Sequence, residues 1–176
     1  VGTLRLLGAR AAAHEAGLDE ALRGSNPDVA LEREARPAEG AAWVAALAGV
    51  DLVVRVGFDD DALLRAAVRT GVPVVVTQVK DGAADVVAFH KHGPCPHAPL
   101  DVPVRATTSG APDAGDVVAG LLAAAEALAI LTGNGGDARA RHLRAPLDGR
   151  DATTQEIPWT PECFTCGGSG LEMSFS

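Results

Sequence analysis

Apolar and polar positions along the chain follow two periods, and these separate predicted helices from predicted strands. Residues 6–24 ("LLGARAAAHEAGLDEALRG") have helical spacing and end at a glycine, which is followed by the turn "SNPD". Residues 29–34 ("VALERE") alternate apolar with polar side chains, which predicts a strand with one solvated face. Residues 38–49 ("AEGAAWVAALAG") predict a short helix that a second glycine closes.

The middle of the chain contains two continuous apolar runs, 51–58 ("DLVVRVGF") and 72–79 ("VPVVVTQV"). Such runs are typical of strands that are buried on both faces. Between them, residues 59–71 ("DDDALLRAAVRTG") predict a helix whose acidic first turn suits the helix macrodipole. Residues 84–90 ("ADVVAFH") are expected to form a strand that pairs with 72–79 across the turn "KDG".

The C-terminal half begins with a loop rich in Pro, Gly and His at 91–103, followed by the longest predicted helix, which runs to about Ile130. One or two short strands are predicted, at 140–145 and 152–159, before a tail that carries cysteines. Helices that alternate with buried strands predict an α/β fold. We expect one domain over 1–176, with a mostly parallel sheet flanked by helices, an antiparallel extension and the Cys-bearing C-terminal tail.

Charge and composition narrow the possible partners and compartments. The net charge of −8 argues against a nucleic-acid partner. A chain with three cysteines and one C-x-x-C pair indicates the reducing cytoplasm rather than a disulfide framework. The apolar run "VVAGLLAAAEALAIL" contains Glu126 and is expected to be too short to span a membrane. Glu126 is either a buried partner for an arginine or a solvated side chain, and His142 is expected on the surface.

Two of the three cysteines, Cys163 and Cys166, lie in the stretch "PECFTCGG" near the end of the chain. A metal clip, a redox dithiol and two unrelated buried thiols are the alternatives. The two-residue separation suits tetrahedral chelation of zinc by thiolates. The redox alternative is weaker, because the pair is not placed at a strand-to-helix turn that would activate a thiol.

Four landmarks follow one another in a characteristic order: "SNPDVALE", the strand–acidic turn–helix–strand segment 50–76, "GPCPHAP", and "GAPDAGDVVAGLLAAAEALAILTG" with "CFTC" after it. Their order resembles the C-terminal two-thirds of the ubiquitin-activating/ThiF/MoeB family. The spacing of the long helix is kept by Gly110, Gly120, Glu126, Ala127, Leu128, Leu131, Thr132 and Gly133. The resemblance implies a Rossmann-like sheet and an assembly that is usually a homodimer.

The resemblance also implies an activity. Family members bind ATP and magnesium and adenylate a C-terminal carboxylate of a ubiquitin-like protein, a sulfur-carrier protein or a peptide. It would place the magnesium-binding carboxylate at Asp59, Asp60 or Asp61, because a hard cation prefers carboxylate oxygen. The family has an arginine and an asparagine on the helix after the acidic turn; Arg65 would correspond to one of them, or both are lost. Arg5 would stand where the family has its catalytic lysine. The alternative for the three acids is stabilisation of a helix dipole.

The resemblance likewise implies a structural zinc ion, and this ion would tie the loop after the hairpin to the C-terminal tail. Cys163 and Cys166 would supply two ligands and Cys95 a third. Ala98 stands where the family has its second loop cysteine; His97, one residue before it, would supply the fourth ligand, and His90 and His92 are close by in the sequence. A degenerate, metal-free loop is the alternative. A site with three cysteines and one histidine is ordinary for zinc.

Departures from the family keep two function hypotheses open. The phosphate-binding "GxGxxG" and the acidic residue that holds the ribose are missing, so the domain looks incomplete at its N-terminus. The transfer cysteine is replaced by the stretch "RATTSG". The chain is therefore expected to adenylate a carboxylate only if the missing segment is supplied. The rival is a catalytically degenerate module that binds a peptide or partner protein, and a fragment without independent function is the third alternative.

Overall fold

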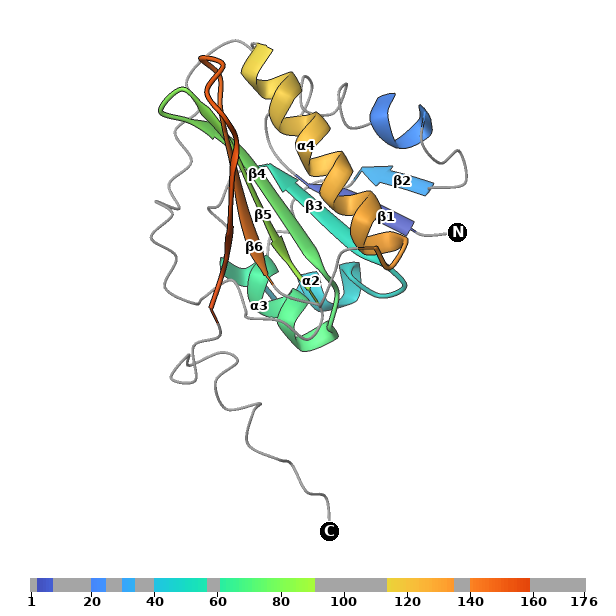
Figure 1. Cartoon of the computed structure of the whole chain (residues 1–176). Helices are drawn as coiled ribbons and strands as arrows, with labels where there is room; N and C mark the ends of the chain where they lie inside the picture. The colour runs from blue at the N-terminus through green and yellow to red at the C-terminus, as the bar shows by residue number, and fades with distance from the viewer. Residues whose placement is uncertain are drawn as a thin grey trace.

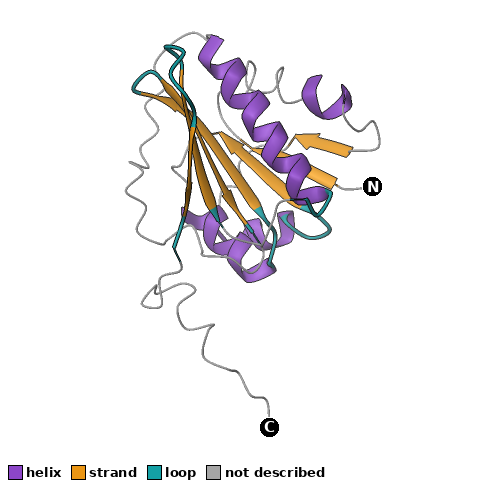
Figure 2. Cartoon of the chain, viewed as in Figure 1, coloured by secondary structure: helices purple, strands orange, loops and turns teal. Residues whose placement is uncertain are grey.

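The computed structural model describes residues 3–7, 20–24, 30–33, 40–56, 61–90, 114–134 and 140–158. The elements are β1 (Thr3–Leu7), β2 (Ala30–Arg33), α2 (Gly40–Ala46), β3 (Leu52–Val56), α3 (Asp61–Thr70), β4 (Val74–Lys80), β5 (Ala83–Phe89), α4 (Ala114–Leu131), β6 (Arg141–Pro146) and β7 (Thr153–Glu156). They form one mixed sheet, with α4 on one face and α2 and α3 on the other (Figures 1 and 2). The prediction of an α/β fold is confirmed.

The sheet has the order β2-β1-β3-β4-β5-β6-β7 and divides into two halves. β1 pairs in parallel with β2 and β3, and β3 pairs in parallel with β4. From β4 onward every described pairing is antiparallel, through β5 and β6 to β7. The antiparallel extension is thus confirmed, but it makes up half of the described pairings, so "mostly parallel" was wrong.

The change of direction occurs at a two-residue hairpin turn between β4 and β5. Lys80 and Ala83 are register partners, and Asp81 and Gly82 between them have φ values of 50° and 69°. Positive φ at both central residues is the conformation that the Asp-Gly pair favours in tight hairpins. A turn this short returns the chain beside β4, which leaves no room for a parallel crossover. The pairing predicted across "KDG" is confirmed.

The first strand was not predicted. Leu6 and Leu7 belong to β1, whereas the apolar spacing of 6–24 had predicted a helix from residue 6; helical structure is described at 20–24. β1 lies between β2 and β3, so both of its edges form hydrogen-bonded ladders with strands distant in sequence. Such pairing outweighs the local helical spacing in a five-residue stretch.

The helix α4 lies on the sheet through small side chains. Ala119, Ala123, Ala124 and Ala127 are fully buried against strand residues, and the Thr77 hydroxyl donates a hydrogen bond to the Ala119 carbonyl (3.2 Å). Small residues allow the helix backbone to approach the sheet closely. By length and composition alone α4 could cross a membrane, contrary to the sequence-based expectation, although 33% of it is buried in the fold.

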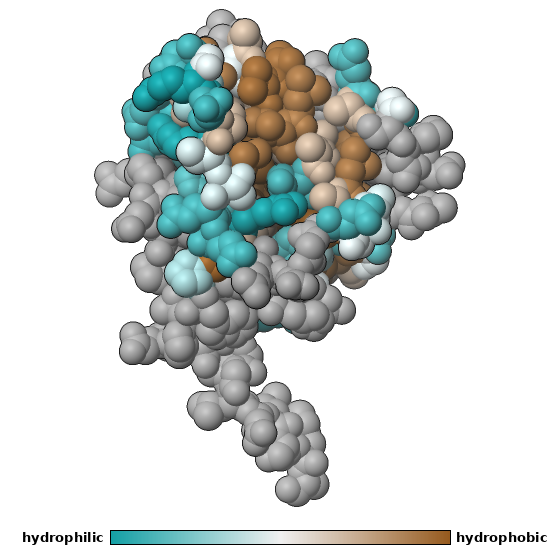
Figure 3. Space-filling model, viewed as in Figure 1, coloured by the Kyte–Doolittle hydropathy of each residue, from teal (hydrophilic) through white to brown (hydrophobic). Residues whose placement is uncertain are grey.

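The outward face of α4 is also apolar. Val117 and Leu121 are exposed there, and Figure 3 shows the apolar surface gathered along this helix. The opposite face of the sheet is covered by α2 and α3. Trp43 of α2, Leu47 of the turn after it and Leu63 of α3 are almost fully buried. Trp43 is therefore a core residue.

Candidate functional site

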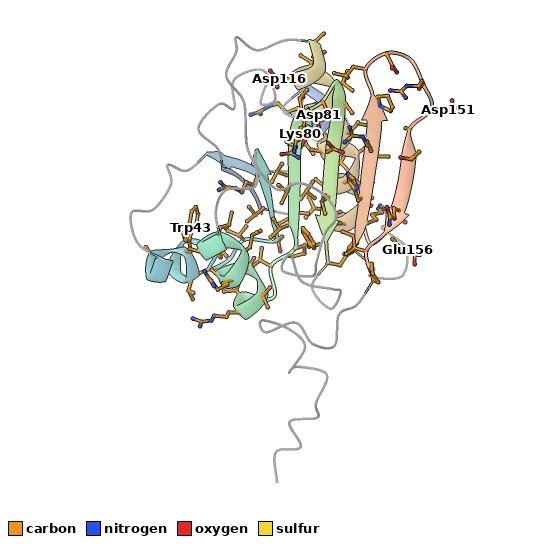
Figure 4. All side chains as sticks on the ribbon, turned by 90° about the vertical axis from the view of Figure 1, so that its left-hand side faces the viewer. Trp43, Lys80, Asp81, Asp116, Asp151 and Glu156 are labelled. Atoms are coloured by element: carbon orange, nitrogen blue, oxygen red, sulfur yellow. The ribbon has the colours of Figure 1, made fainter. Side chains whose placement is uncertain are left out.

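The sheet face beneath α2 and α3 changes from apolar to polar along the strands. The strand register creates successive rows of neighbouring side chains on this face. The first row is apolar and contains Val53, Val74, Phe89, Ala140 and Ile157. The second row is mixed and contains Arg55, Val76, Val87, His142 and Gln155. The third row is polar and contains Gln78, Asp85, Arg144 and Thr153. Figure 4 shows Trp43 towards one end of the sheet and Lys80 towards the other.

The polar rows centre on Asp85, which is only 1% exposed. Its two carboxylate oxygens accept hydrogen bonds from Arg144 Nη1 at 3.0 and 2.8 Å, and Oδ1 also lies 2.8 Å from His142 Nε2. A buried carboxylate is tolerated when it is paired and hydrogen-bonded in this way. We call Gln78, Asp85, His142 and Arg144 the Asp85 cluster.

This contact assigns the hydrogen-bonding roles of the two ring nitrogens of His142. An ionised carboxylate only accepts hydrogen bonds, so His142 Nε2 must carry the hydrogen that points at Asp85. In the neutral imidazole, Nδ1 then holds the lone pair. The His142 side chain is 14% exposed, so the surface position expected from the sequence was wrong.

Gln78 is the register neighbour of Asp85 on β4 and is 3% exposed. Its side-chain Nε2 is buried and has no hydrogen-bond partner within the described part of the chain. Leaving a buried amide donor unpaired costs about 1–3 kcal/mol. Gln78 also lies towards the carboxyl end of a parallel strand, the edge where open α/β sheets bind ligands. The unpaired donor is therefore placed where a ligand oxygen could satisfy it.

A second polar group lies on the α4 face, at the opposite end of the sheet. Arg141 Nε donates to Glu126 Oε2 at 2.7 Å, which decides between the two alternatives for Glu126: it is the partner of an arginine. His90 lies near this pair. Burial lowers the pKa of His90, the Arg141 charge lowers it further, and Glu126 acts in the opposite direction.

The residues predicted from sequence motifs are only in part described. Arg65 is an exposed residue of α3, and Arg5 lies in β1 opposite Glu32 of β2 and Val53 of β3. Asp61 begins α3. The remaining predicted residues, Asp59, Asp60, Cys95, His97, Cys163 and Cys166, lie outside the described residues. Where residues are described, no three His, Cys, Asp or Glu side chains form a group that could hold a metal.

Sequence reasoning missed all four members of the Asp85 cluster. One signal was available: Gln78 and Asp85 are polar residues inside runs that otherwise have the composition of buried strands. A second signal was the i, i+2 spacing of His142 and Arg144, which places both side chains on one face of a strand. The pairing of these strands brings the residues together, and it cannot be predicted from the residues of any one strand.

Comparison with known proteins supports the fold. No protein-family model matches the chain, and no curated protein matches its sequence. Solved structures are similar: PaaA (TM-score 0.63, 9% identity, 89% of this chain and 73% of PaaA), E. coli MccB (0.62, 15%, 98% and 60%) and the heterocyclase TruD (0.65, 14%, 93% and 27%). The chain thus spans less than two thirds of MccB and of TruD.

These findings correct the family assignment made from motif order. No model of the ubiquitin-activating/ThiF/MoeB family matches, and the similar structures include PaaA, MccB and TruD. One landmark has a simpler physical origin. The "LTG" at the end of the long helix is a helix terminus: Gly133 has φ 72°, and the Thr132 hydroxyl donates to the Leu128 carbonyl at 2.7 Å. Helices of unrelated families end in the same way.

Proposed function

We propose that this chain is part of an ATP-dependent enzyme that modifies a peptide, and that it activates a carboxylate of that peptide by adenylation. The proposal is supported by the similarity to MccB, which has been solved with ATP and with AMPCPP together with MccA. The heterocyclase TruD shares the fold. At 13–14% identity these similarities establish the fold alone, so the activity is proposed for this chain and rests on its own site.

The observation that carries the proposal is the Asp85 cluster at the carboxyl end of β4. Gln78 offers a buried, unpaired amide donor, and Arg144 uses only Nη1 towards Asp85. The guanidinium group has further N–H donors, which suit a carbonyl, carboxylate or phosphate oxygen. An arginine and an amide on either side of Asp85 suit a substrate that presents oxygen acceptors, as a peptide carboxylate and a nucleotide phosphate both do.

The nucleotide would be bound by the residues that were predicted from the sequence motifs. Asp59 and Asp60 lie in the chain between β3 and α3, and we propose that they hold magnesium, with Arg5 and Arg65 contacting phosphate oxygens. Magnesium would neutralise the phosphate charge that develops during adenylation. The zinc clip of Cys95, His97, Cys163 and Cys166, the homodimer and the cytoplasmic location stay predictions.

A second function is favoured by the sequence itself. The chain contains no "GxGxxG" and has "TTS" at 107–109 in place of a transfer cysteine. A domain of this fold without its own phosphate loop could bind a peptide or partner protein and leave the chemistry to another segment. In this alternative the Asp85 cluster recognises a peptide but does not take part in a reaction.

Pyrophosphate exchange separates the two functions. The full-length protein would be incubated with ATP, magnesium, labelled pyrophosphate and a pool of random heptapeptides with free C-terminal carboxylates. The matched control is the same pool with C-terminal amides. Exchange that requires the free carboxylate supports adenylation. Absence of exchange, together with measurable retention of the peptides, would replace the enzyme by the binding module.

A further inference from the structure

We infer that His142 is a catalytic base that accepts a proton at Nδ1 when the activated acyl group is transferred to a neutral amine. The inference rests on the proposed function and adds a second step to it, in which the acyl-adenylate is consumed. It assigns His142 a place in the chemistry that the sequence did not suggest, with Asp85 and Arg144 as positioning residues.

The geometry of the Asp85 cluster fits this role. Asp85 is buried, and Arg144 Nη1 binds both of its oxygens at 3.0 and 2.8 Å, which holds the carboxylate in one orientation. The carboxylate in turn accepts a hydrogen bond from His142 Nε2 at 2.8 Å. A carboxylate bound to one ring nitrogen fixes the tautomer and the orientation of a histidine whose other nitrogen acts as the base. The lone pair at His142 Nδ1 is thereby directed away from Asp85.

Adenylation of a carboxylate does not need such a base, because the attacking oxygen is already ionised. A base is needed when a neutral amine attacks the carbonyl carbon of the acyl-adenylate. In that step a C–N bond forms, the C–O bond to the phosphate breaks, and AMP leaves with the electron pair. The proton of the amine nitrogen passes to His142 Nδ1 and then to water, so atoms and charges balance without a further reactant.

Gln78 provides an independent observation in the same place. Gln78 is only 3% exposed, and its side-chain Nε2 has no hydrogen-bond partner in the described structure. It is the neighbour of Asp85 across β4 and β5. During acyl transfer, negative charge develops on the carbonyl oxygen, and a fixed amide donor stabilises that charge. A base on β6 and an unpaired donor on β4, on either side of Asp85 in β5, are the two groups that acyl transfer requires.

The test measures the two steps separately in the full-length protein. Pyrophosphate exchange with the free-carboxylate heptapeptide pool reports activation, and AMP formation after addition of glycinamide reports transfer to a neutral amine. The variants are His142→Gln, His142→Gly and Asp85→Asn, with Gln155→Ala as the matched control. Gln155 is exposed on β7 and is the register neighbour of His142, but belongs to no part of the proposed machinery.

We expect His142→Gln to keep exchange within about twofold of wild type and to lower AMP formation by about 10²–10⁴-fold, the usual contribution of a general base. Asp85→Asn should lower AMP formation as well, and added imidazole should partly restore His142→Gly. Gln155→Ala should leave both rates unchanged. Thermal unfolding of each variant would show that the fold is kept.

Three results would overturn the inference. Undiminished AMP formation by His142→Gln would remove His142 from the chemistry while the proposed function stands. Equal loss of exchange and AMP formation would place His142 in activation or in folding rather than in transfer. Absence of exchange by the wild-type protein would end the proposed function, and the inference with it.

Discussion

Arg144 of β6 faces Asp85 of β5 in register, and its Nη1 donates to both oxygens of that nearly inaccessible carboxylate. The two partners differ in their surroundings, because the Arg144 side chain is 37% exposed and that of Asp85 is 1% exposed. Water can therefore hydrate the arginine when the pair is broken, but it cannot hydrate the carboxylate. The energetic consequences of removing either partner are unequal.

Arg144→Leu should accordingly destabilise the protein by about 2–3 kcal/mol, below the range for fully buried pairs because Arg144 is partly solvated. Asp85→Asn should lower the free energy of unfolding by less, since the partly exposed Arg144 side chain can then be hydrated by water. Urea denaturation measures both. Arg150→Leu is the matched control: Arg150 pairs with Asp148 at the exposed end of the β6–β7 hairpin, and its loss should not change the midpoint. Equal costs for Arg144→Leu and Arg150→Leu would contradict the burial argument.

His90 should make the stability depend on pH below neutrality. Its pKa is lowered in the folded protein, first by burial and then by Arg141, with Glu126 opposing. The unfolded chain therefore binds more protons than the folded one once the pH falls below about 6.5, the ordinary value for histidine. Stability should be fully present at higher pH and decline as the pH falls through this range. Urea midpoints from pH 8 to pH 5 would show a smaller decline in His90→Gln; an identical decline would exclude His90 as its source.

Gly82 should be sensitive to a side chain for conformational reasons alone. Its φ is +69°, and a Cβ built there would meet no atom within 4 Å, so any cost comes from the backbone. Gly82→Ala should destabilise the protein by about 1–2 kcal/mol. Gly24→Ala is the control, because Gly24 lies in a helix, has equal space and lacks a positive φ. A loss for Gly24→Ala as large as for Gly82→Ala would argue against the hairpin turn.

The cysteines define a prediction about metal content. We expect one zinc per chain in the reduced, freshly purified protein, lost in Cys95→Ser and in His97→Ala. Elemental analysis of the protein after dialysis measures it. Zinc that persists in Cys163→Ser would reject the tail as part of the site, and a metal-free wild type would leave the C-x-x-C pair without a ligand role.

Several elements could be predicted because their own residues decide them. β3 and β4 are long apolar runs rich in valine, and α3 has apolar residues on one face together with a glycine after its end. The Asp-Gly pair predicts a hairpin turn from two residues alone. The family assignment failed for the complementary reason, because glycines, helix ends and single cysteines satisfy local needs common to many α/β proteins.

The sequence by itself determined the fold class, most strands and helices, and the hairpin that reverses the sheet, since these depend on local periodicity and turn chemistry. Only the tertiary structure decided that β1 is a strand between β2 and β3, and that half of the described pairings are antiparallel. It also decided the site. Gln78, Asp85 and Arg144 lie on three strands, and only the register of those strands makes them neighbours. Aspartate is usually exposed, but burial and pairing hold the Asp85 carboxylate in one orientation.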